Sequence, residues 1–518
     1  MRCHSLSNRV VITGLGAITP IGIGKEAFWQ ALLAGKNGID KITHFDASGC
    51  HAQIAGEVTD FDPAAYIDKK EAKRMDRYTQ FAVAAAKLAI EDAKLDLEKE
   101  NKERIGTFIG AGIGGIETMH SQYQKLFDKG PSKVSPFFIP MMIANMAAGQ
   151  VAITYGLHGP SACIVTACAT GTDCIGHAFR AIEIGKADVA VAGGTEASIS
   201  EAAVAGFCAM KALCADHNDD PAHASRPFDK NRSGFVMGEG AGLVVLESLE
   251  HAEKRGAHIY AELVGYGANA DAYHVTSPAP HGEYQAKCMA RAIEDAGLTP
   301  ADIDYVNAHG TSTNMNDKGE TEAIKTTFGA AAKDISVSSI KSMTGHLLGA
   351  AGGGRVLVLP RVGGRVLRWC GAPGGGGTRV GDHRVVPVLP SEGFGSQELA
   401  EVTNDFNATV RALAENPVAL PVAFDDYGRL RLVAHRREGE DFLRLSVYST
   451  SAAVHADLER AGPLFIIRHG ASVIRFLDEH SERILFVTVD PASCFRPIEF
   501  PASLPQYFAT MPPPRRAD

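Results

Sequence analysis

The sequence predicts an α/β fold over its first two-thirds and a smaller α+β region after it. Short apolar runs that end in glycine turns are typical of buried strands, and residues 9–16 form such a run. Segments with apolar residues at helical spacing lie between these runs, as in residues 81–95. Alternation of the two patterns is typical of a layered α/β domain.

The expected strands fall into two series along the chain. The first series covers residues 9–16, 104–110 and 187–194, and the second covers 259–268, 303–308 and 335–339. A strand over 161–166 and a helix over 172–184 are expected on either side of Cys168. In both series a chemically reactive residue directly follows a strand, which favours an internal duplication of one layered unit.

Composition and charge limit the possible functions. A chain of 518 residues is long enough for two or three domains. The hydrophobic content of 45% and charged content of 21% are typical of a globular protein. A net charge of −9 gives no general case for nucleic-acid binding, so an acidic partner has to meet a local basic patch.

The ten cysteines include no Cys-x-x-Cys pair, which argues against a zinc ribbon or a redox pair. This use of cysteine favours a location in the reducing cytoplasm. The first residues lack the apolar stretch of a signal peptide, and no apolar run approaches the length of about 18 residues that a membrane helix needs. We therefore expect a cytoplasmic protein that binds neither membranes nor nucleic acids.

The composition changes abruptly near residue 352. No lysine follows Lys341, and residues 353–395 are rich in Gly, Arg and Val, as a linker is. A folded pattern returns after residue 396. It predicts a helix over 398–415 and strands over 418–424, 429–435, 442–448, 464–468 and 484–489. The expected parts are a first half (1–255), a partial second half (256–352), a poorly ordered joint (353–395) and a small α+β domain of unknown function (396–510).

Cys168 is the first candidate for chemistry. It lies at the expected strand-to-helix turn, where unpaired N–H groups and the positive end of the helix dipole favour a thiolate. Its own backbone N–H can donate to a developing oxyanion, and its small neighbours leave room for an acyl thioester. The alternative interpretation is a buried structural cysteine.

Two distant histidines are the next candidates. His309 enters a loop of small hydroxyl residues, in which Thr311 and Thr313 can bond a polar chain such as a pantetheine arm. His346 is expected near the start of a helix, where a neutral imidazole can donate to a carbonyl that becomes an enolate. A thiol with two imidazoles can hold an acyl group and act on a second carbonyl compound. The alternative is a loop histidine that caps a turn.

Lys341 precedes His346 by five residues, and Asp317 and Glu320 are acidic residues that can pair with it. Such a pair would fix the position of the lysine. The alternative is a solvated network of surface charges.

Taken together, these segments resemble the β-ketoacyl-acyl-carrier-protein synthases, most closely the elongating synthase II type, over about residues 9–352. Further motifs of the resemblance occupy residues 193–197, 229–242 and 271–278. The family has the thiolase fold, which implies a five-layered αβαβα body, here with an incomplete second half and an added small C-terminal α+β domain. Members are usually dimers, so we expect a homodimer.

The resemblance implies a decarboxylative Claisen condensation in fatty acid elongation. Cys168 would accept an acyl chain from acyl carrier protein, and His309 and His346 would assist decarboxylation of malonyl-carrier-protein. The resemblance also implies an ion pair between Lys341 and Glu320. No metal and no cofactor are implied, because phosphopantetheine arrives on the carrier protein.

The resemblance also assigns substrate contacts. Thr311 and Thr313 match the pantetheine contacts, Ile113 matches a residue at the mouth of the acyl pocket, and Phe235 is assigned to substrate binding.

A local basic patch suits the acidic carrier protein. Its candidates share one helix-like stretch and are Lys69, Lys70, Lys73, Arg74 and Arg77. Lys125, Lys129 and Lys133 are possible additions. The alternative is an ordinary solvated helix face.

The chain departs from the family after about Gly352. Members continue with further strands and a Gly-Phe-Gly-Gly loop, whose phenylalanine gates the acyl pocket and whose backbone supplies a second oxyanion donor. Residues 392–396 resemble this loop only faintly. Loss of one oxyanion donor typically costs about 10²–10³ in rate, so impaired activity is expected. A chimera that only binds carrier protein is the alternative, and a thiolase, which uses a second cysteine as base, is the nearest competing enzyme.

Overall fold

The computed structural model describes residues 8–362, residues 384–385 and six strands between residues 422 and 488, with side-chain surroundings for residues 8–358. The chain divides into two compact units, Met1–Ser396 and Gln397–Asp518. None of the helices in these described ranges is long and apolar enough to cross a lipid bilayer.

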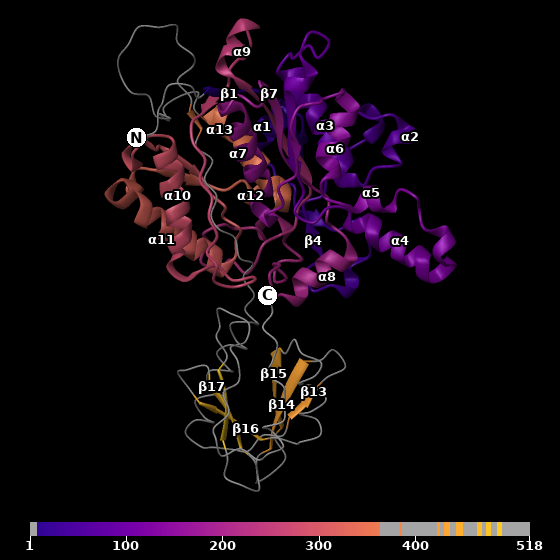
Figure 1. Ribbon diagram of the computed structural model, residues 1–518, viewed down its shortest axis with the longest axis vertical. Helices are drawn as coiled ribbons and strands as arrows, with labels where there is room; N and C mark the ends of the chain where they lie inside the picture. The colour runs from indigo at the N-terminus through magenta and orange to yellow at the C-terminus, as the bar shows by residue number, and fades with distance from the viewer. Residues whose placement is uncertain are drawn as a thin grey trace. The chain divides into compact units, whose positions relative to one another are not determined.

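A mixed eight-stranded sheet forms the centre of the first unit (Figure 1). Its order is β12-β9-β1-β8-β7-β5-β6, with β2 paired to β1 beside this path. The strands are β1 (Val10–Thr19), β2 (Gly22–Ile23), β5 (Ile105–Gly110), β6 (Ser161–Ala162), β7 (Val189–Glu196), β8 (Gly240–Ser248), β9 (Ala261–Leu263) and β12 (Arg384–Val385). Strand β5 is parallel to β6 and β7, whereas β8 runs antiparallel to β7 and β1. The first predicted series of strands is confirmed, with boundary shifts of a few residues.

Helices cover both faces of this sheet (Figure 1), so the predicted α/β class is confirmed. Helices α3 (Arg77–Asp92) and α6 (Met146–Tyr155) cover one face, and α7 (Thr170–Glu183) and α13 (Ala351–Val362) cover the other. Because side chains alternate along a strand, Val189 and Val191 of β7 pack under α3, while Ala190 and Ala192 pack under α7.

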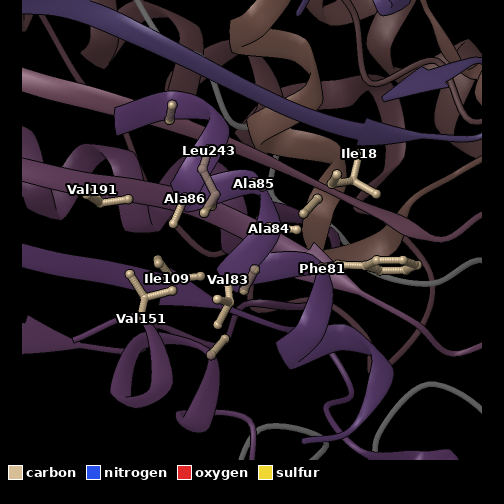
Figure 2. Close-up of a cluster of buried hydrophobic side chains, with 14 of the residues drawn as sticks. Ile18, Phe81, Val83, Ala84, Ala85, Ala86, Ile109, Val151, Val191 and Leu243 are labelled. Carbon is tan, nitrogen blue, oxygen red and sulfur yellow. The ribbon is translucent and has the colours of Figure 1, made fainter. Parts of the chain in front are cut away.

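The α3 face shows why β1 carries glycines. Figure 2 shows Phe81 and Val83 of α3 in one cluster of buried side chains with Val191 and Leu243 of the sheet. A Cβ added to Gly16 would lie 2.0 Å from the carbonyl oxygen of Ala85 in α3. Glycine therefore lets the helix backbone rest directly on the strand.

Several other elements of the first unit are short or peripheral. They are α1 (Lys25–Leu33), α2 (Lys69–Ala72), α4 (Ile116–Lys129), α5 (Phe138–Met142), α8 (Glu201–Ala209), α9 (Leu249–Lys254), α12 (Lys341–Thr344), β3 (Asp40–Lys41) and β4 (Ile54–Ala55).

The second predicted series differs from expectation. Strand β9 is only three residues long and joins the first sheet by pairing with β1, so it does not begin a second sheet. The other two strands, β10 (Tyr305–Asn307) and β11 (Ser336–Ser338), form a parallel pair beside α10 (Glu283–Asp295) and α11 (Asn314–Phe328). The duplication is thus less regular than the sequence pattern indicated.

Part of the predicted joint belongs to a described helix. Residues 353–362 belong to helix α13, because glycines let it approach the sheet and an apolar run follows them. A Cβ on Gly353 would lie 1.9 Å from the carbonyl oxygen of Gly242, and Val356 and Leu357 are buried. Within the same predicted joint, residues 384–385 pair in parallel with β9.

The second unit contains two three-stranded antiparallel sheets in its described residues. They comprise β13 (Val422–Phe424), β14 (Arg429–His435), β15 (Phe442–Tyr448), β16 (Leu464–Arg468), β17 (Val473–Leu477) and β18 (Ile484–Thr488). The five predicted strands are confirmed, three of them with their predicted bounds. Strand β17 was missed because Arg475 interrupts its short apolar run. The predicted helix over 398–415 and residues 363–383 lie outside the described residues.

Candidate active site

Cys168 lies on a short 3₁₀ turn, Ala167–Ala169, that leads directly into helix α7. Strand β6 ends at Ala162, earlier than predicted, but the position of Cys168 just before a helix agrees with expectation. The Thr166 N–H donates to Oγ1 of Thr170 (2.9 Å), which ties the start of this turn to the helix. The cysteine is buried, with 3% of its surface exposed.

Three segments far apart in sequence meet at this turn. The sulfur of Cys168 and one ring nitrogen each of His309 and His346 lie within 4.8 Å of one another, and all three residues are buried. The two imidazole rings are nearly perpendicular, with centroids 5.2 Å apart. A thiol and two imidazoles therefore share one small site.

His346 is held by its backbone and its ring. It lies between α12 and a 3₁₀ turn at Leu348–Ala350. Its N–H donates to the Val236 carbonyl (2.7 Å), and its own carbonyl accepts from Gly238 (2.8 Å). The Leu348 N–H donates to its Nδ1 (3.1 Å). Since Nδ1 accepts, the proton of the neutral ring is on Nε2.

His309 is oriented by a lysine. Its Nδ1 lies 3.3 Å from Nζ of the buried Lys341, which also donates to the His309 carbonyl at 2.5 Å. An ammonium group can only donate, so Nδ1 is the acceptor and Nε2 carries the proton. Both imidazoles therefore have the same tautomer.

Both histidines are neutral at neutral pH. Burial lowers the pKa of His309 and of His346 well below the usual value, and the nearby Lys341 cation adds to this in each case. The charge of Arg355, which is also buried, acts in the same direction. Two neutral rings beside a thiol can donate N–H bonds to an oxygen on which negative charge develops.

The same three side chains could be considered for a metal site. A metal needs an imidazole lone pair, and Nε2 offers one only if the proton moves to Nδ1. In both rings Nδ1 already faces an N–H donor, from Lys341 or Leu348. The donor set therefore suits hydrogen bonding to an oxyanion and opposes metal coordination.

The predicted ion pair between Lys341 and Glu320 is replaced by a different arrangement. The buried Glu320 carboxylate accepts from the N–H groups of His309 (2.7 Å) and Gly310 (2.8 Å). Positive φ angles at Gly310 and Ser312 turn the backbone of this loop. Lys341 instead contacts the ring and carbonyl of His309, and no Lys341–Glu320 ion pair forms among the described residues. The two charged groups hold His309 from different sides.

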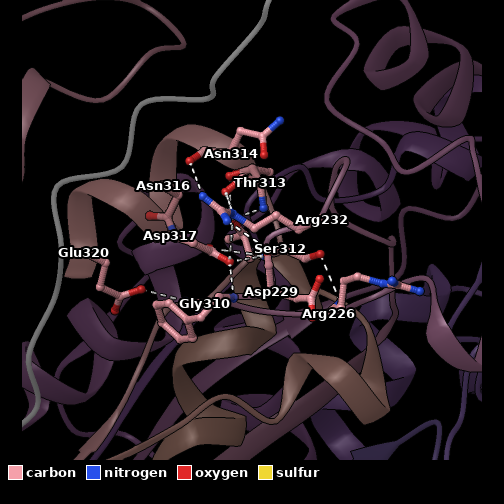
Figure 3. Close-up of polar contacts among 12 residues, drawn as sticks. Arg226, Asp229, Arg232, Gly310, Ser312, Thr313, Asn314, Asn316, Asp317 and Glu320 are labelled. Carbon is pink, nitrogen blue, oxygen red and sulfur yellow. Dashed lines mark hydrogen bonds and ion pairs between the residues drawn. The ribbon is translucent and has the colours of Figure 1, made fainter. Parts of the chain in front are cut away.

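Asp317, the other acid considered for Lys341, pairs with Arg232 instead (3.6 Å). Figure 3 shows how Arg232 ties the loop after His309 to the 226–232 segment by bonds to the carbonyls of Thr313 and Asn314. Asp317 also accepts from the N–H groups of Phe228 and Ser312. This network holds the loop that carries the predicted pantetheine contacts.

The predicted substrate residues lie around the same site. The hydroxyls of Thr311 and Thr313 are 2.8 Å apart on the loop after His309. The Phe235 ring is buried, 5.4 Å from the His346 ring, and shares a core cluster with Cys168. Ile113 is 39% exposed on the loop after β5. All four are therefore on segments next to the cysteine or the histidines.

The predicted docking residues divide into two groups. Lys69, Lys70, Lys73 and Arg74 are exposed on or beside α2, as are Lys125, Lys129 and Lys133 on or near α4. Arg77 is different: its guanidinium bonds both oxygens of the buried Glu239 (3.0 and 2.8 Å). It lies at the start of α3, where burial against Phe81 turns it inward. Arg77 is therefore paired with a buried carboxylate, unlike the exposed cations of α2, and its place in carrier docking stays a prediction.

Sequence reasoning missed two residues near this site. Arg355 lies beyond the composition break and so was assigned to the joint. Glu196 belongs to the motif at 193–197 but was given no role, although its buried carboxylate contacts two loops of the site. A glutamate at the end of a fully buried strand was the available signal for Glu196.

Comparisons with known proteins place the first unit in a family. The model of the β-ketoacyl synthase N-terminal domain matches residues 7–252, and that of the C-terminal domain matches residues 260–359. The 3-oxoacyl-[acyl-carrier-protein] synthase 2 of Staphylococcus aureus (strain COL) is 55% identical over 349 residues, 67% of this chain and 84% of that protein. The protein of the same name from Synechocystis sp. is 55% identical over 345 residues, 67% of this chain and 83% of that protein.

Solved structures agree with this result. A β-ketoacyl synthase from Burkholderia phymatum STM815 matches with a TM-score of 0.64 and 36% identity, over 68% of this chain and 86% of that one. A structure of a type II PKS acyl-carrier protein in complex with its ketosynthase matches with a TM-score of 0.63 and 35% identity, over 68% of this chain and 86% of that one. The thiolase-like fold predicted from sequence is thereby confirmed.

Proposed function

The chain belongs to the β-ketoacyl synthase family, and from this premise we propose that it is a 3-oxoacyl-[acyl-carrier-protein] synthase of the fatty-acid-elongating type. The observation that carries the proposal is the meeting of one buried thiol with two imidazoles whose protons are both fixed on Nε2. The names of its relatives supply the substrate class.

The first half-reaction loads the enzyme. The Cys168 thiolate attacks the carbonyl carbon of an acyl-carrier-protein thioester, forming a new C–S bond. The bond to the phosphopantetheine sulfur breaks, and that sulfur leaves as the carrier thiol after taking up a proton. Burial of Cys168 protects the resulting thioester from water.

The second half-reaction forms the carbon–carbon bond. Malonyl-carrier-protein loses its carboxylate as CO₂, and the electron pair moves into the thioester as an enolate. The Nε2–H groups of His309 and His346 donate to the enolate oxygen. The enolate carbon then attacks the acyl group on Cys168, giving a β-ketoacyl product and the free thiolate.

The supporting residues have separate tasks. Lys341 and Glu320 orient His309 through its ring, carbonyl and backbone N–H. Thr311 and Thr313 offer hydroxyls to the pantetheine arm, and Ile113 and Phe235 line the path of the substrate. All of them lie on or next to segments that carry the thiol or an imidazole.

We further propose that acyl carrier protein docks at the exposed cations Lys69, Lys70, Lys73 and Arg74. The carrier is acidic, and these groups give a local positive charge on a chain whose net charge is −9.

We also propose a homodimer, because Phe127, Ile153 and Val165 leave large apolar surfaces exposed in the single chain. The cysteine pattern favours a reducing cytoplasm.

The altered sequence after the family match favours a lower rate of condensation than in relatives that have the complete second half. The family match ends at residue 359, and the sequence has no Gly-Phe-Gly-Gly segment after it. We retain the binding-only chimera as a second candidate for this reason. It would dock carrier protein without acyl transfer.

One experiment separates the two candidates. The purified full-length chain is incubated with acyl-carrier-protein, and the mass of the Cys168 peptide is followed before and after malonyl-carrier-protein is added. Acylation followed by a β-ketoacyl product supports the synthase, with Cys168→Ala as the control. Carrier binding without any acylation overturns it in favour of the second candidate.

A further inference from the structure

Glu196 is a fully buried carboxylate that links two loops of the site. It is the last residue of β7, and its oxygens accept five hydrogen bonds. One oxygen, Oε2, accepts from the N–H groups of Gly112 (2.7 Å) and Gly349 (3.0 Å). The other accepts from Ile113 N–H (3.2 Å), Gly114 N–H (3.4 Å) and the Ser198 hydroxyl (3.0 Å).

Each linked loop carries a residue of the proposed active site. The loop at 112–114 carries the half-exposed Ile113. Gly349 directly follows Leu348, whose N–H fixes the tautomer of His346. A single carboxylate thus connects the proposed substrate entrance to the turn that orients an imidazole.

The cysteine turn is in contact with the same junction. A Cβ on Gly349 would lie 2.4 Å from the Gly112 nitrogen, and a Cβ on Gly112 would lie 3.3 Å from the carbonyl oxygen of Ala167, next to Cys168. The backbones of Gly112 and Gly349 are too close to admit a Cβ between them, and the Ala167 carbonyl lies in close contact with Gly112. Any change in the spacing of the two loops therefore moves a wall of the cysteine turn.

The donors around Glu196 favour an ionised carboxylate, although burial outweighs these bonds and raises the pKa of its carboxyl group. The four backbone N–H groups can only donate, so each oxygen has to accept, and an amide would turn a hydrogen toward some of them. Glutamine keeps the shape of the side chain but not the pattern of acceptors. Aspartate keeps the acceptors but has a shorter reach.

We propose that Glu196 is a positioning residue that locks the Ile113 loop and the His346 turn at one spacing and thereby sets which acyl chains Cys168 accepts. The proposal rests on the proposed synthase function, because it concerns the acyl chain of that reaction. Glu196 acts through the loop that carries Ile113.

The test compares Glu196→Gln and Glu196→Asp with the unaltered full-length chain. The kcat/KM for acylation of Cys168 is measured over a series of acyl-carrier-proteins from short to long chains. We expect Glu196→Gln to make the kcat/KM values for different acyl chains more alike. The ratio of kcat/KM between the best and the worst acyl chain should fall by about tenfold or more. Glu196→Asp should reduce it less, since both acceptors remain.

Glu247→Gln is the matched control, because Glu247 is an equally buried carboxylate on β8 that bonds only side chains of another region. It should lower stability and leave the chain-length ratio unchanged. A loss of equal size for every acyl chain in Glu196→Gln would overturn the proposal. The double variant with Ile113→Ala should be non-additive in the same ratio, because both changes act through one loop.

Hydrogen exchange tests the coupling without enzyme activity. Glu196→Gln should speed amide exchange at 112–114 and at 349 together, and unchanged exchange at either segment overturns the proposal. If Glu196→Gln does not fold, Ser198→Ala removes one donor from the same carboxylate and should show a smaller change at both segments. If the unaltered chain is never acylated, the synthase function fails while the exchange result still decides the role of Glu196.

Discussion

Nζ of Lys341 lies 3.3 Å from Nδ1 of His309, and this contact decides which nitrogen of the imidazole carries its proton. The lysine also bonds the His309 carbonyl, so it fixes both the ring and the backbone. The cation helps to keep the pKa of His309 low, after burial as the larger cause. Removing the lysine should therefore change both the tautomer and the charge of the ring.

For Lys341→Met we expect malonyl decarboxylation to fall by about 10²-fold in kcat with little change in KM, because one oxyanion donor is lost. Loss of the cation should also raise the pKa of His309, so the acid limb of the pH–rate profile should move to higher pH. Release of CO₂ across the pH range gives both results. Lys318→Met, an exposed lysine on α11, is the control, and an equal loss in both variants would contradict the role of Lys341.

The two groups of predicted docking cations should respond differently to mutation. Replacing Lys70 and Lys73 by alanine should raise KM for carrier protein and weaken its salt dependence, with no change in melting temperature, since both are exposed. A binding titration at two salt concentrations measures this effect. Unchanged affinity would show that the carrier docks elsewhere.

Arg77→Met should act on stability. It leaves the buried Glu239 without its bidentate partner, and removal of one member of such a pair costs about 3 kcal/mol or more in the free energy of unfolding. Denaturant unfolding measures this cost. If Arg77→Met lowers carrier affinity and leaves stability intact, the assignment of Arg77 as a structural residue is wrong.

His251 should make stability depend on pH. Its Nδ1 bonds Glu247 (2.6 Å) and its Nε2 bonds Glu100 (2.9 Å), and the bond to Glu247 is the main cause of its raised pKa. Burial of Glu247 opposes ionisation, but bonds from Arg255, His251 and Thr13 lower the pKa of Glu247 to about 2, so it stays ionised.

A raised histidine pKa means that the folded state holds the proton more tightly than the unfolded state. The stabilisation is fully present below the unfolded pKa of about 6.5 and is lost as the pH rises through the folded pKa. Denaturant unfolding from about pH 6 to pH 9 should show this decline, and His251→Gln should remove it. A variant with the same pH dependence as the unaltered chain would contradict the assignment.

Gly16→Ala should strongly destabilise the first unit. The added Cβ would lie 2.0 Å from the Ala85 carbonyl, so α3 has to move away from the sheet, and such overpacking costs about 1–3 kcal/mol or more. Thermal unfolding measures the change. Gly49→Ala is the control, because a Cβ there meets no atom within 4 Å. Equal melting temperatures for both variants would argue against close packing of β1 and α3.

Local patterns in the sequence were sufficient for the elements that local forces decide. The apolar runs of β1, β5 and β7 and the turn that carries Cys168 were predicted because strand and helix periodicity act over a few residues. Strands of the second unit were predicted for the same reason. Strand β9 was correctly predicted as a strand, but its assignment to a second layered unit was wrong. Its pairing with β1 depends on residues about 250 positions away, which local patterns do not report.

The sequence by itself determined that a thiol, two imidazoles and their small-residue frames belong to one kind of chemistry. Only the tertiary structure decided the partner of each charged side chain. Lys341 contacts His309, Asp317 pairs with Arg232, and Arg77 bonds Glu239. It also gave Glu196 its place between two loops. The physical reason is that a charged side chain can satisfy its hydrogen bonds with many partners, and only the packing of distant segments brings one of them within about 3 Å.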